Sequence, residues 1–408
     1  MAEAFDVVVV GGGIAVSALA TTLARGGLAV AVLEQDVEPV DRVRGEFMVP
    51  WGVIELKKLG LLDTLLSAGG LFGEHHLSYN ENAPGDAALP YVVRYADVVP
   101  EVPGGLCMGH PAMCRALGDA ARQAGATVLT GVESVEVTAG TPPSIAFSHT
   151  GSRVEWTPRL IVGADGRNSQ VRHQLGFEVK ADPPHNLLGG MLVDGVPGWP
   201  QDTAFGTEDR VHFLIFGQGG DRVRLYLCYD FADKQAYAGP QRQHKLIETF
   251  ARLRCLPQAD LIAASRPIGP FNSFSNEDHW VEDPTAPGIV LVGDAAGHND
   301  PITGQGLAIA LRDARLVAEI VLAGRFERVA FRPYVEERLE RMRRLRIAAR
   351  FAARLRAEFG PDARARRARA SARMRQRMPS PLLATLVGPE KVPASYFEQS
   401  TIDALVAP

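Results

Sequence analysis

The first apolar segment of the chain, FDVVVV over residues 5–10, has no polar alternation, which predicts a strand buried on both faces of a parallel sheet. Three glycines at positions 11–13 follow, and the apolar periodicity that continues to about Arg25 predicts a helix. A second buried strand is expected over residues 28–36, with Glu34 near its end. A strand, a glycine turn, a helix and a strand within about 30 residues form the opening of a nucleotide-binding βαβ unit.

Further predicted helices and strands follow along the chain. Amphipathic helices are predicted at residues 50–66 and 111–124, and a short strand at 126–131. Two later segments are again apolar strands that run into glycine-bounded turns, RLIVGADGRNSQVR (159–172) and GIVLVGD (288–294). We therefore expect them in the same parallel sheet as the N-terminal strands.

The stretch between these two segments has a different pattern. Apolar and polar residues alternate in VHFLIF (211–216) and VRLYLCY (223–229), with Gly, Pro and Asp between the runs. This pattern predicts an antiparallel sheet, with one helix near 241–254. Because buried parallel strands lie on both sides of it, the sheet is expected to be inserted into the nucleotide-binding domain.

The predicted fold class is therefore α/β. A discontinuous Rossmann-like domain (1–174 and 276–330) holds an inserted antiparallel sheet domain (175–275) and is followed by a helical C-terminal segment (331–408).

Composition restricts the classes of function. The net charge of -4 over 408 residues argues against nucleic acid as a partner. Residues 338–377 contain many Arg and no Lys, which is compatible with a basic patch, a dimer contact or, since Glu residues are interspersed, a solvated or domain-bridging helix. The four cysteines form no CxxC pair and are expected to be reduced and mostly buried, without a metal site. No leader-like or membrane-spanning pattern is found, so a cytoplasmic protein is expected.

The glycines before the first predicted helix indicate a bound ligand. Gly11 and Gly13 would let the backbone approach a diphosphate at a helix N-terminus, and Glu34 would accept hydrogen bonds from a ribose. The fingerprint is incomplete, because Val16 occupies its third glycine position, and a packing turn without ligand is the alternative.

Three blocks carry a resemblance to a known family. VVVVGGGIAVSALA (7–20), VGADGRNSQVR (162–172) and LVGDAAGHNDPITGQG (291–306) resemble, in order and spacing, the single-component FAD-dependent aromatic monooxygenases related to para-hydroxybenzoate hydroxylase. RVRGEFMVPWGVIELKKLGLLD (42–63) and HPAMCRALGDAARQAGATVLTG (110–131) are similar to two further FAD-side segments of that family. One departure is Gly297, which stands where the family usually has His.

The resemblance implies site residues. Asp294 would bind the ribityl chain, the backbone N–H groups of residues 304–307 would face the N1/O2 edge of the isoalloxazine, and the loop at Pro301 would cover the flavin face. Asp165 would lie near the cofactor, or alternatively would cap the helix behind it. The full implied cofactor set is Gly11, Gly13, Ile14, Glu34, Gln35, Arg44, His110, Val132, Asp165, Asp294, Gly304, Gly306 and Leu307.

The activity implied by the resemblance is oxygen insertion. NADPH or NADH would reduce FAD, O2 would add to give the C4a-hydroperoxyflavin, and one oxygen would pass to an aromatic or polyketide-like small molecule, as in secondary metabolism. The substrate would lie against one face of the inserted sheet, where His212 and Tyr226 are either polar pocket residues or ordinary sheet residues. The pattern identifies no catalytic base, and it leaves open a monomer or a homodimer.

Other functions on the same scaffold stay open. A flavin-dependent halogenase is suggested by the first block and by GEFMVP (45–50), although no WxWxIP motif is present. A reductase of isoprenoid double bonds is a second alternative. The non-enzymatic alternative is a binding module that has lost its cofactor.

Overall fold

The N-terminal apolar run forms β1 (Val7–Val10), which lies inside a six-stranded sheet in our computed structural model, whose described residues are 4–82 and 89–407. β1 pairs in parallel with β2 (Val30–Glu34) on one side and β12 (Leu160–Gly163) on the other. The remaining strands of this sheet are β8 (Thr127–Thr130), β20 (Thr285–Ala286) and β21 (Ile289–Leu291). The sheet is thus assembled from segments far apart in the chain, and the predicted α/β fold class is confirmed.

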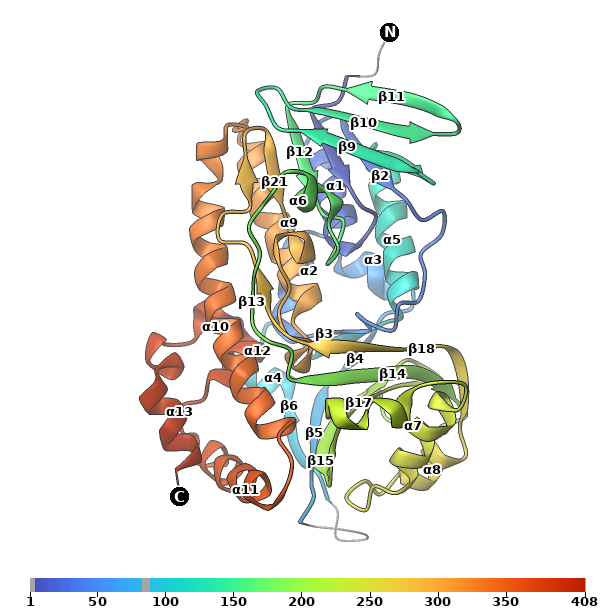
Figure 1. The fold of residues 1–408 in the computed structure, drawn as a ribbon, viewed down its shortest axis with the longest axis vertical. Helices are drawn as coiled ribbons and strands as arrows, with labels where there is room; N and C mark the ends of the chain where they lie inside the picture. Colours follow the sequence, from blue (N-terminus) through green and yellow to red (C-terminus); the bar gives the residue numbers. More distant parts are fainter. Residues whose placement is uncertain (1–3, 83–88, 408) are drawn as a thin grey trace.

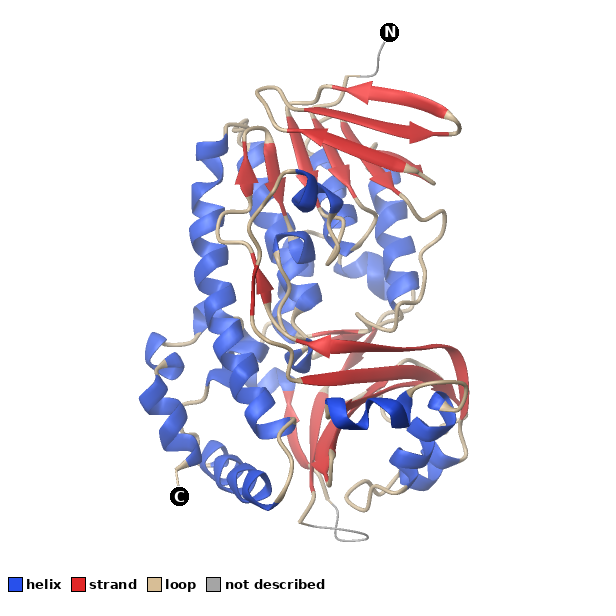
Figure 2. Cartoon of the chain, in the orientation of Figure 1, coloured by secondary structure: helices blue, strands red, loops and turns tan. Residues whose placement is uncertain are grey.

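The alternate residues of β1 pack against different layers. Val7 and Val9 belong to a core shared with helices, whereas Val8 and Val10 belong to a core shared with an antiparallel sheet. The helices are α1 (Ile14–Arg25), α5 (His110–Gln123) and α9 (Gly306–Leu322). The covering sheet, visible at the top of Figure 2, is made of β9 (Ser134–Thr138), β10 (Ser144–His149) and β11 (Ser152–Trp156). Burial on both faces explains why β1 is uniformly apolar.

A second, seven-stranded sheet lies beyond the first (Figure 1). In spatial order its strands are β18 (Arg266–Asn276), β14 (Asn186–Asp194), β17 (Val223–Tyr229), β16 (Val211–Gly217), β15 (Thr203–Glu208), β5 (His75–Asn80) and β6 (Tyr91–Arg94). One face packs on α7 (Arg242–Ala251) and α8 (Ala259–Ala263). The other face is turned toward the site described below.

This second sheet is larger than the segment predicted for it. The predicted range 175–275 supplies β14 to β18, but β5 and β6 come from residues 75–94, which the sequence pattern had assigned to the nucleotide-binding part. β5 adds in parallel to β15, with His76 opposite Thr203. Because its sequence, HHLSYN, contains little apolar alternation, nothing local marks it as a sheet strand.

Glycines divide two of the predicted helices. The helix expected at 50–66 is α2 (Pro50–Lys58) and α3 (Leu62–Ser67), separated at Gly60, whose φ is +66°. The long C-terminal helix is α10 (Arg332–Arg356) and α11 (Pro361–Arg375), separated at Gly360, whose φ is +98°. A positive φ suits glycine and ends a regular helix.

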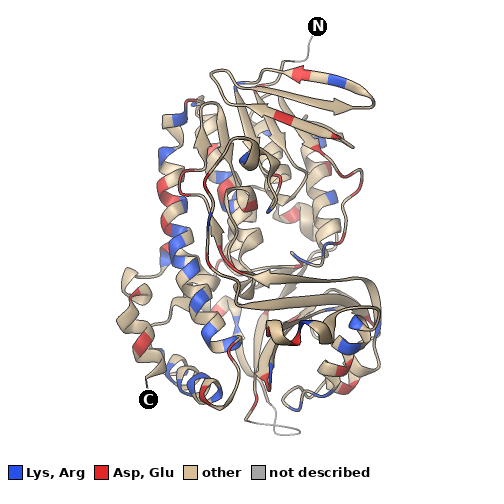
Figure 3. Ribbon diagram, viewed as in Figure 1, with Lys and Arg blue, Asp and Glu red and all other residues tan. Residues whose placement is uncertain are grey.

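The Arg-rich segment bridges the two sheets. At one end of α10 the hydroxyl of Tyr334 donates to the carbonyl of Leu291 in the first sheet, and at the other end Thr207 in the second sheet donates to the carbonyl of Arg356. Acidic residues lie beside the basic ones along α10 (Figure 3). The domain-bridging interpretation is therefore confirmed for α10.

The described residues also form smaller strands and α-helices. They are β3 (Phe47–Met48), β4 (Leu71–Gly73), β7 (Gly105–Cys107), β13 (Lys180–Ala181), β19 (His279–Trp280), α4 (Tyr95–Val98), α6 (Gln170–Gln174), α12 (Ala384–Val387) and α13 (Gln399–Val406). All four cysteines are buried and unpaired, as expected. Within residues 4–82 and 89–407, no helix has the length and apolar character needed to cross a bilayer.

Candidate functional site

A cavity of about 2570 Å³ extends from the carboxyl ends of β1 and β2 to the open face of the second sheet. Pockets for small ligands commonly measure about 300–1,000 Å³, so this one has room for a dinucleotide and a second molecule. Every cofactor residue implied by the sequence lines it, as do Pro301 and Tyr226. His212 does not.

The glycine turn shows which positions need bare backbone and why. A Cβ on Gly11, whose φ is +115°, would lie 2.6 Å from the carbonyl oxygen of Ala164. A Cβ on Gly13 would meet no atom within 4 Å, so that position is open toward the cavity. Val16, at the third glycine position, is fully buried in the core and leaves the cavity unobstructed. The turn therefore presents free backbone at the start of α1, where an anion is stabilised.

Charged side chains surround this end of the cavity. Burial raises the pKa of Glu34, which accepts a hydrogen bond from the backbone N–H of Asp36 at 2.8 Å. Burial and the neighbouring Arg167 lower the pKa of Arg44, and Arg44 forms no ion pair among the described residues. Arg167 lies 3.4 Å from Asp294. Two guanidinium groups near one carboxylate leave positive charge that suits a diphosphate.

A second helix N-terminus opens on the same cavity. Gly304 has a φ of +65°, and a Cβ on Gly304 or Gly306 would meet no atom within 4 Å. Between them Gln305 is buried, and its Oε1 accepts a hydrogen bond from the indole N–H of Trp51 at 2.8 Å. This hydrogen bond holds the loop at residues 304–306 through a side chain and does not use its backbone N–H groups. The first N–H groups of α9 have no side-chain cap, so they and the helix dipole are available to an electron-rich group.

Two predicted cofactor residues interact with neighbouring groups of the protein itself. Asp165 accepts hydrogen bonds from the hydroxyl of Ser169 and from the backbone N–H of Gln170, at 2.5 and 2.6 Å. It therefore caps α6, which was the alternative for this position. Burial and Arg44 lower the pKa of His110 to about 4, so His110 is neutral near pH 7.

The far wall of the cavity is a row of residues across the second sheet. Phe205 on β15 pairs with Leu214 on β16, which pairs with Tyr226 on β17, and all three line the cavity. Gly190 lies opposite Tyr226, and a Cβ there would be 2.3 Å from the tyrosine ring. His212 points to the same side of the sheet, but it is buried and hydrogen-bonded to Thr207, outside the cavity lining.

A buried polar group supports Tyr226. Its hydroxyl donates to Glu46 at 2.5 Å, and Arg224 lies 3.3 Å from the other Glu46 oxygen. Burial raises the pKa of Glu46 and that of Tyr226. The sequence pattern did not identify Glu46, although it lies in the GEFMVP segment, because its partners Tyr226 and Arg224 come from a distant strand.

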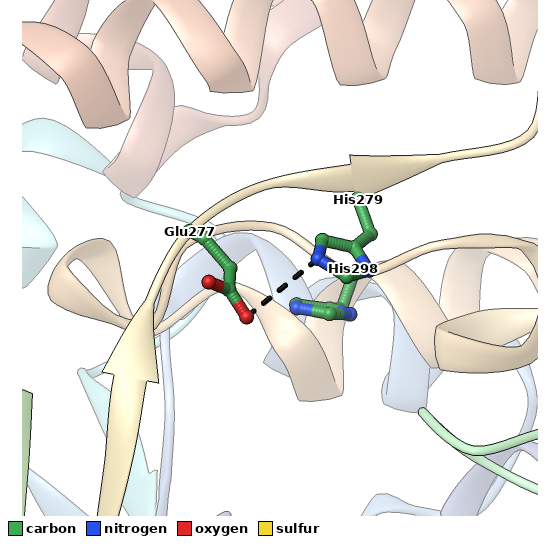
Figure 4. A group of neighbouring side chains, drawn as sticks. All are labelled: Glu277, His279 and His298. Atoms are coloured by element: carbon green, nitrogen blue, oxygen red, sulfur yellow. Dashed lines mark ion pairs between the residues drawn. The ribbon is translucent and has the colours of Figure 1, made fainter. Parts of the chain in front are cut away.

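Three further side chains, Glu277, His279 and His298, converge on one another outside the cavity lining (Figure 4). Their potential ligand atoms lie within 4.8 Å of one another, and Glu277 and His279 are 3.6 Å apart. Burial, with the nearby cation Arg167, lowers the pKa of His298 to about 3, and burial also lowers the pKa of His279, to which Arg172 and Arg167 contribute. The positive charge of these two arginines opposes a bound cation.

The backbone of His279 explains why Gly297 stands where the family usually has His. A Cβ on Gly297 would lie 2.4 Å from the carbonyl oxygen of His279, so the backbone of β19 excludes any side chain at that position.

Comparisons with known proteins agree with this geometry. A family model described as "FAD binding domain" matches residues 4–349. Squalene monooxygenase of Rattus norvegicus is 28% identical over 342 residues, which is 78% of this chain but 54% of that enzyme. A 1H-pyrrole-2-carbonyl-[peptidyl-carrier protein] chlorinase of Pseudomonas fluorescens is 26% identical over 364 residues, covering 81% of this chain and 79% of that protein.

Among solved structures, p-nitrophenol 4-monooxygenase from Pseudomonas putida superimposes with a TM-score of 0.78 at 18% identity, over 99% of this chain and 98% of that one. The chain spans about half the length of the squalene monooxygenases that it matches.

Proposed function

Since the chain belongs to the FAD binding domain family, which confirms the resemblance drawn from its sequence, we propose that it is an FAD-dependent monooxygenase. It would use NADPH or NADH and O2 to insert one oxygen into an aromatic or polyketide-like small molecule. The observation that carries the proposal is the continuity of one cavity, which runs from the glycine turn at Gly11 to the apolar face at Phe205.

The residues present fit the cofactor. FAD carries a diphosphate and an extended ring system, and the cavity offers free backbone at Gly13 and at Gly304; it is also lined by the cation Arg44, which forms no ion pair among the described residues. We assign the diphosphate to the first helix N-terminus and the ring system to the second. When bound, FAD would supply the transfer of electrons from the nicotinamide to O2.

This chain's own residues would position and shield the reaction. The N–H groups at the start of α9 would stabilise negative charge on the ring edge. The row formed by Phe205, Leu214 and Tyr226 would exclude water from the space opposite, which strengthens every electrostatic interaction inside it. The Tyr226 hydroxyl, held by Glu46, is the polar group we assign to that wall.

A halogenase is the second candidate function, because one relative is named as a chlorinase. A reductase of isoprenoid double bonds is the third. The three reactions differ in what they consume: a monooxygenase consumes O2 without a halide, a halogenase requires a halide, and a double-bond reductase needs no O2.

The test is to purify the protein, record its flavin spectrum, and follow NADPH and NADH oxidation with a panel of phenolic and polyketide compounds. O2 uptake that is independent of halide, together with a product 16 mass units heavier, is expected. Strict halide dependence, or product formation without O2, would replace the proposal with the corresponding alternative. A colourless protein that binds no added FAD would refute it.

A further inference from the structure

Arg356 lines the cavity and has no counter-ion in the part of the chain that the structure describes. Arg356 is the last residue of α10, and its guanidinium lines the cavity. It donates to the carbonyl of Ile302 at 3.3 Å and lies 5.1 Å from the ring centre of Phe205. Among the described residues, no carboxylate lies within ion-pair distance of it, whereas Arg338 and Arg350 on the same helix each pair with an aspartate.

The surroundings of Arg356 are neutral. Burial, with Arg356 itself as the nearby charge, lowers the pKa of His76 to about 3, so His76 carries no charge near pH 7. The hydroxyl of Tyr95 is hydrogen-bonded to Thr203 at 2.7 Å, and burial keeps it protonated by raising its pKa. Burial lowers the pKa of Arg356 to about 10, which still leaves the guanidinium charged at neutral pH.

A half-buried charge with no ion-pair partner among the described residues is available to bind an oppositely charged ligand. The guanidinium of Arg356 donates to a carbonyl and lies near an aromatic ring, and neither contact neutralises its charge. Perturbed ionisable groups of this kind in a cleft mark functional sites. The missing partner is therefore expected to be a ligand.

The position of Arg356 indicates the chemical class of this ligand. Ile302 follows Pro301 in the loop that precedes Gly304, so the guanidinium lies between the loop assigned to the flavin face and Phe205 of the apolar wall. We propose that Arg356 binds a carboxylate of the substrate, so that this protein acts on organic acids with an apolar ring-sized body. A guanidinium recognises a carboxylate with parallel N–H donors, which a neutral amide of the same shape cannot match. This inference rests on the proposed function and names its substrate class.

The test compares acids with their amides on the FAD-loaded protein. Benzoate and 2-naphthoate are each titrated against the matching amide, following the flavin absorbance and the heat of binding. At least one acid is expected to bind tenfold or more tightly than its amide. Arg356→Met should abolish that preference, Arg356→Lys should keep part of it, and Arg354→Gln, a neighbour outside the cavity lining, should leave it unchanged.

Stability separates a ligand-binding role from a structural one. Since Arg356→Met removes, at similar volume, a half-buried charge that has no ion-pair partner among the described residues, its Tm without ligand should equal or exceed that of the wild type, with unchanged FAD content. A lowered Tm, no acid that binds better than its amide, or an acid preference that survives Arg356→Met would each overturn the inference. None of these results would affect the proposed flavin chemistry, which fails only if FAD is not bound or O2 is not used.

Discussion

Arg338 on α10 and Asp313 on α9 form an ion pair hidden from solvent, with 2.9 Å between Nε and Oδ2. The same guanidinium donates to the carbonyl oxygens of Gly293, Ala296 and Gly297. One buried arginine thus fixes the loop that carries Asp294, from a helix some 40 residues further along the chain.

Replacing Arg338 with Ala should remove one partner of Asp313 and the side-chain donor of three loop carbonyls, of which that of Ala296 keeps the backbone N–H of Val281. Breaking a buried pair from one side costs about 3–5 kcal/mol, so denaturant unfolding should show a loss of that order, with weaker FAD retention. Arg343→Ala removes an exposed pair with Glu340 and should cost less than about 1 kcal/mol. Equal losses in the two variants would mean that Arg338 has no special role.

The two ends of the glycine turn should respond differently to alanine. Gly13→Ala adds a methyl group where no protein atom lies, so the protein without FAD should keep its Tm while FAD affinity falls about tenfold, or ~1.4 kcal/mol. Gly11→Ala forces a contact with Ala164 at positive φ and should destabilise the protein by about 1–3 kcal/mol. Thermal unfolding and FAD titration measure the two effects separately. Unchanged FAD affinity in Gly13→Ala would contradict a diphosphate at this turn.

Asp278 should make stability depend on pH. Burial, reinforced by the nearby charge of Asp300, raises its pKa from 3.8 to about 7, while Asn299 and the backbone N–H of Asp300 donate to its Oδ1. The folded state then holds more protons than the unfolded state between pH 4 and 7, so this group's contribution to stability falls as pH rises through that window.

The matched variant is Asp278→Asn, which keeps the acceptor oxygen and removes the ionisation. Its free energy of unfolding, relative to the wild type, should rise between pH 5 and pH 8 by about 2–3 kcal/mol, since each pKa unit is worth ~1.4 kcal/mol. Urea titrations at the two pH values measure it. A difference between variant and wild type that is constant with pH would show that Asp278 ionises normally.

Tyr226 and Tyr229 offer a matched pair on opposite faces of β17. Tyr226 lines the cavity and donates to Glu46, whereas Tyr229 is hydrogen-bonded to Ser273 and packs in the core on the other face. With a turnover substrate, Tyr226→Phe should lower kcat/KM about tenfold, the order of one hydrogen bond, at unchanged flavin content. Tyr229→Phe should leave kcat/KM unchanged. The reverse order would remove Tyr226 from the substrate wall.

The nucleotide-binding part was predictable because its signals are local. A glycine turn between a buried strand and a helix is contiguous in sequence, and Glu34 and Gly304 could be located from such patterns alone. The roles of Arg356 and Glu46 could not be predicted in this way, because they depend on which distant segments fold against these two residues. The same holds for His212, whose face of the sheet was predicted but not the side chains that cover it.

The central claim is that one FAD extends from the turn at residues 11–13 to the start of α9. A crystal structure of the FAD complex tests it most directly. We predict density for the adenosine ribose beside Glu34, for the diphosphate at Gly13, and for the ring system against the backbone of Gly304 and Gly306. Density for FAD elsewhere, or a ring system that does not reach Gly304, would contradict the account.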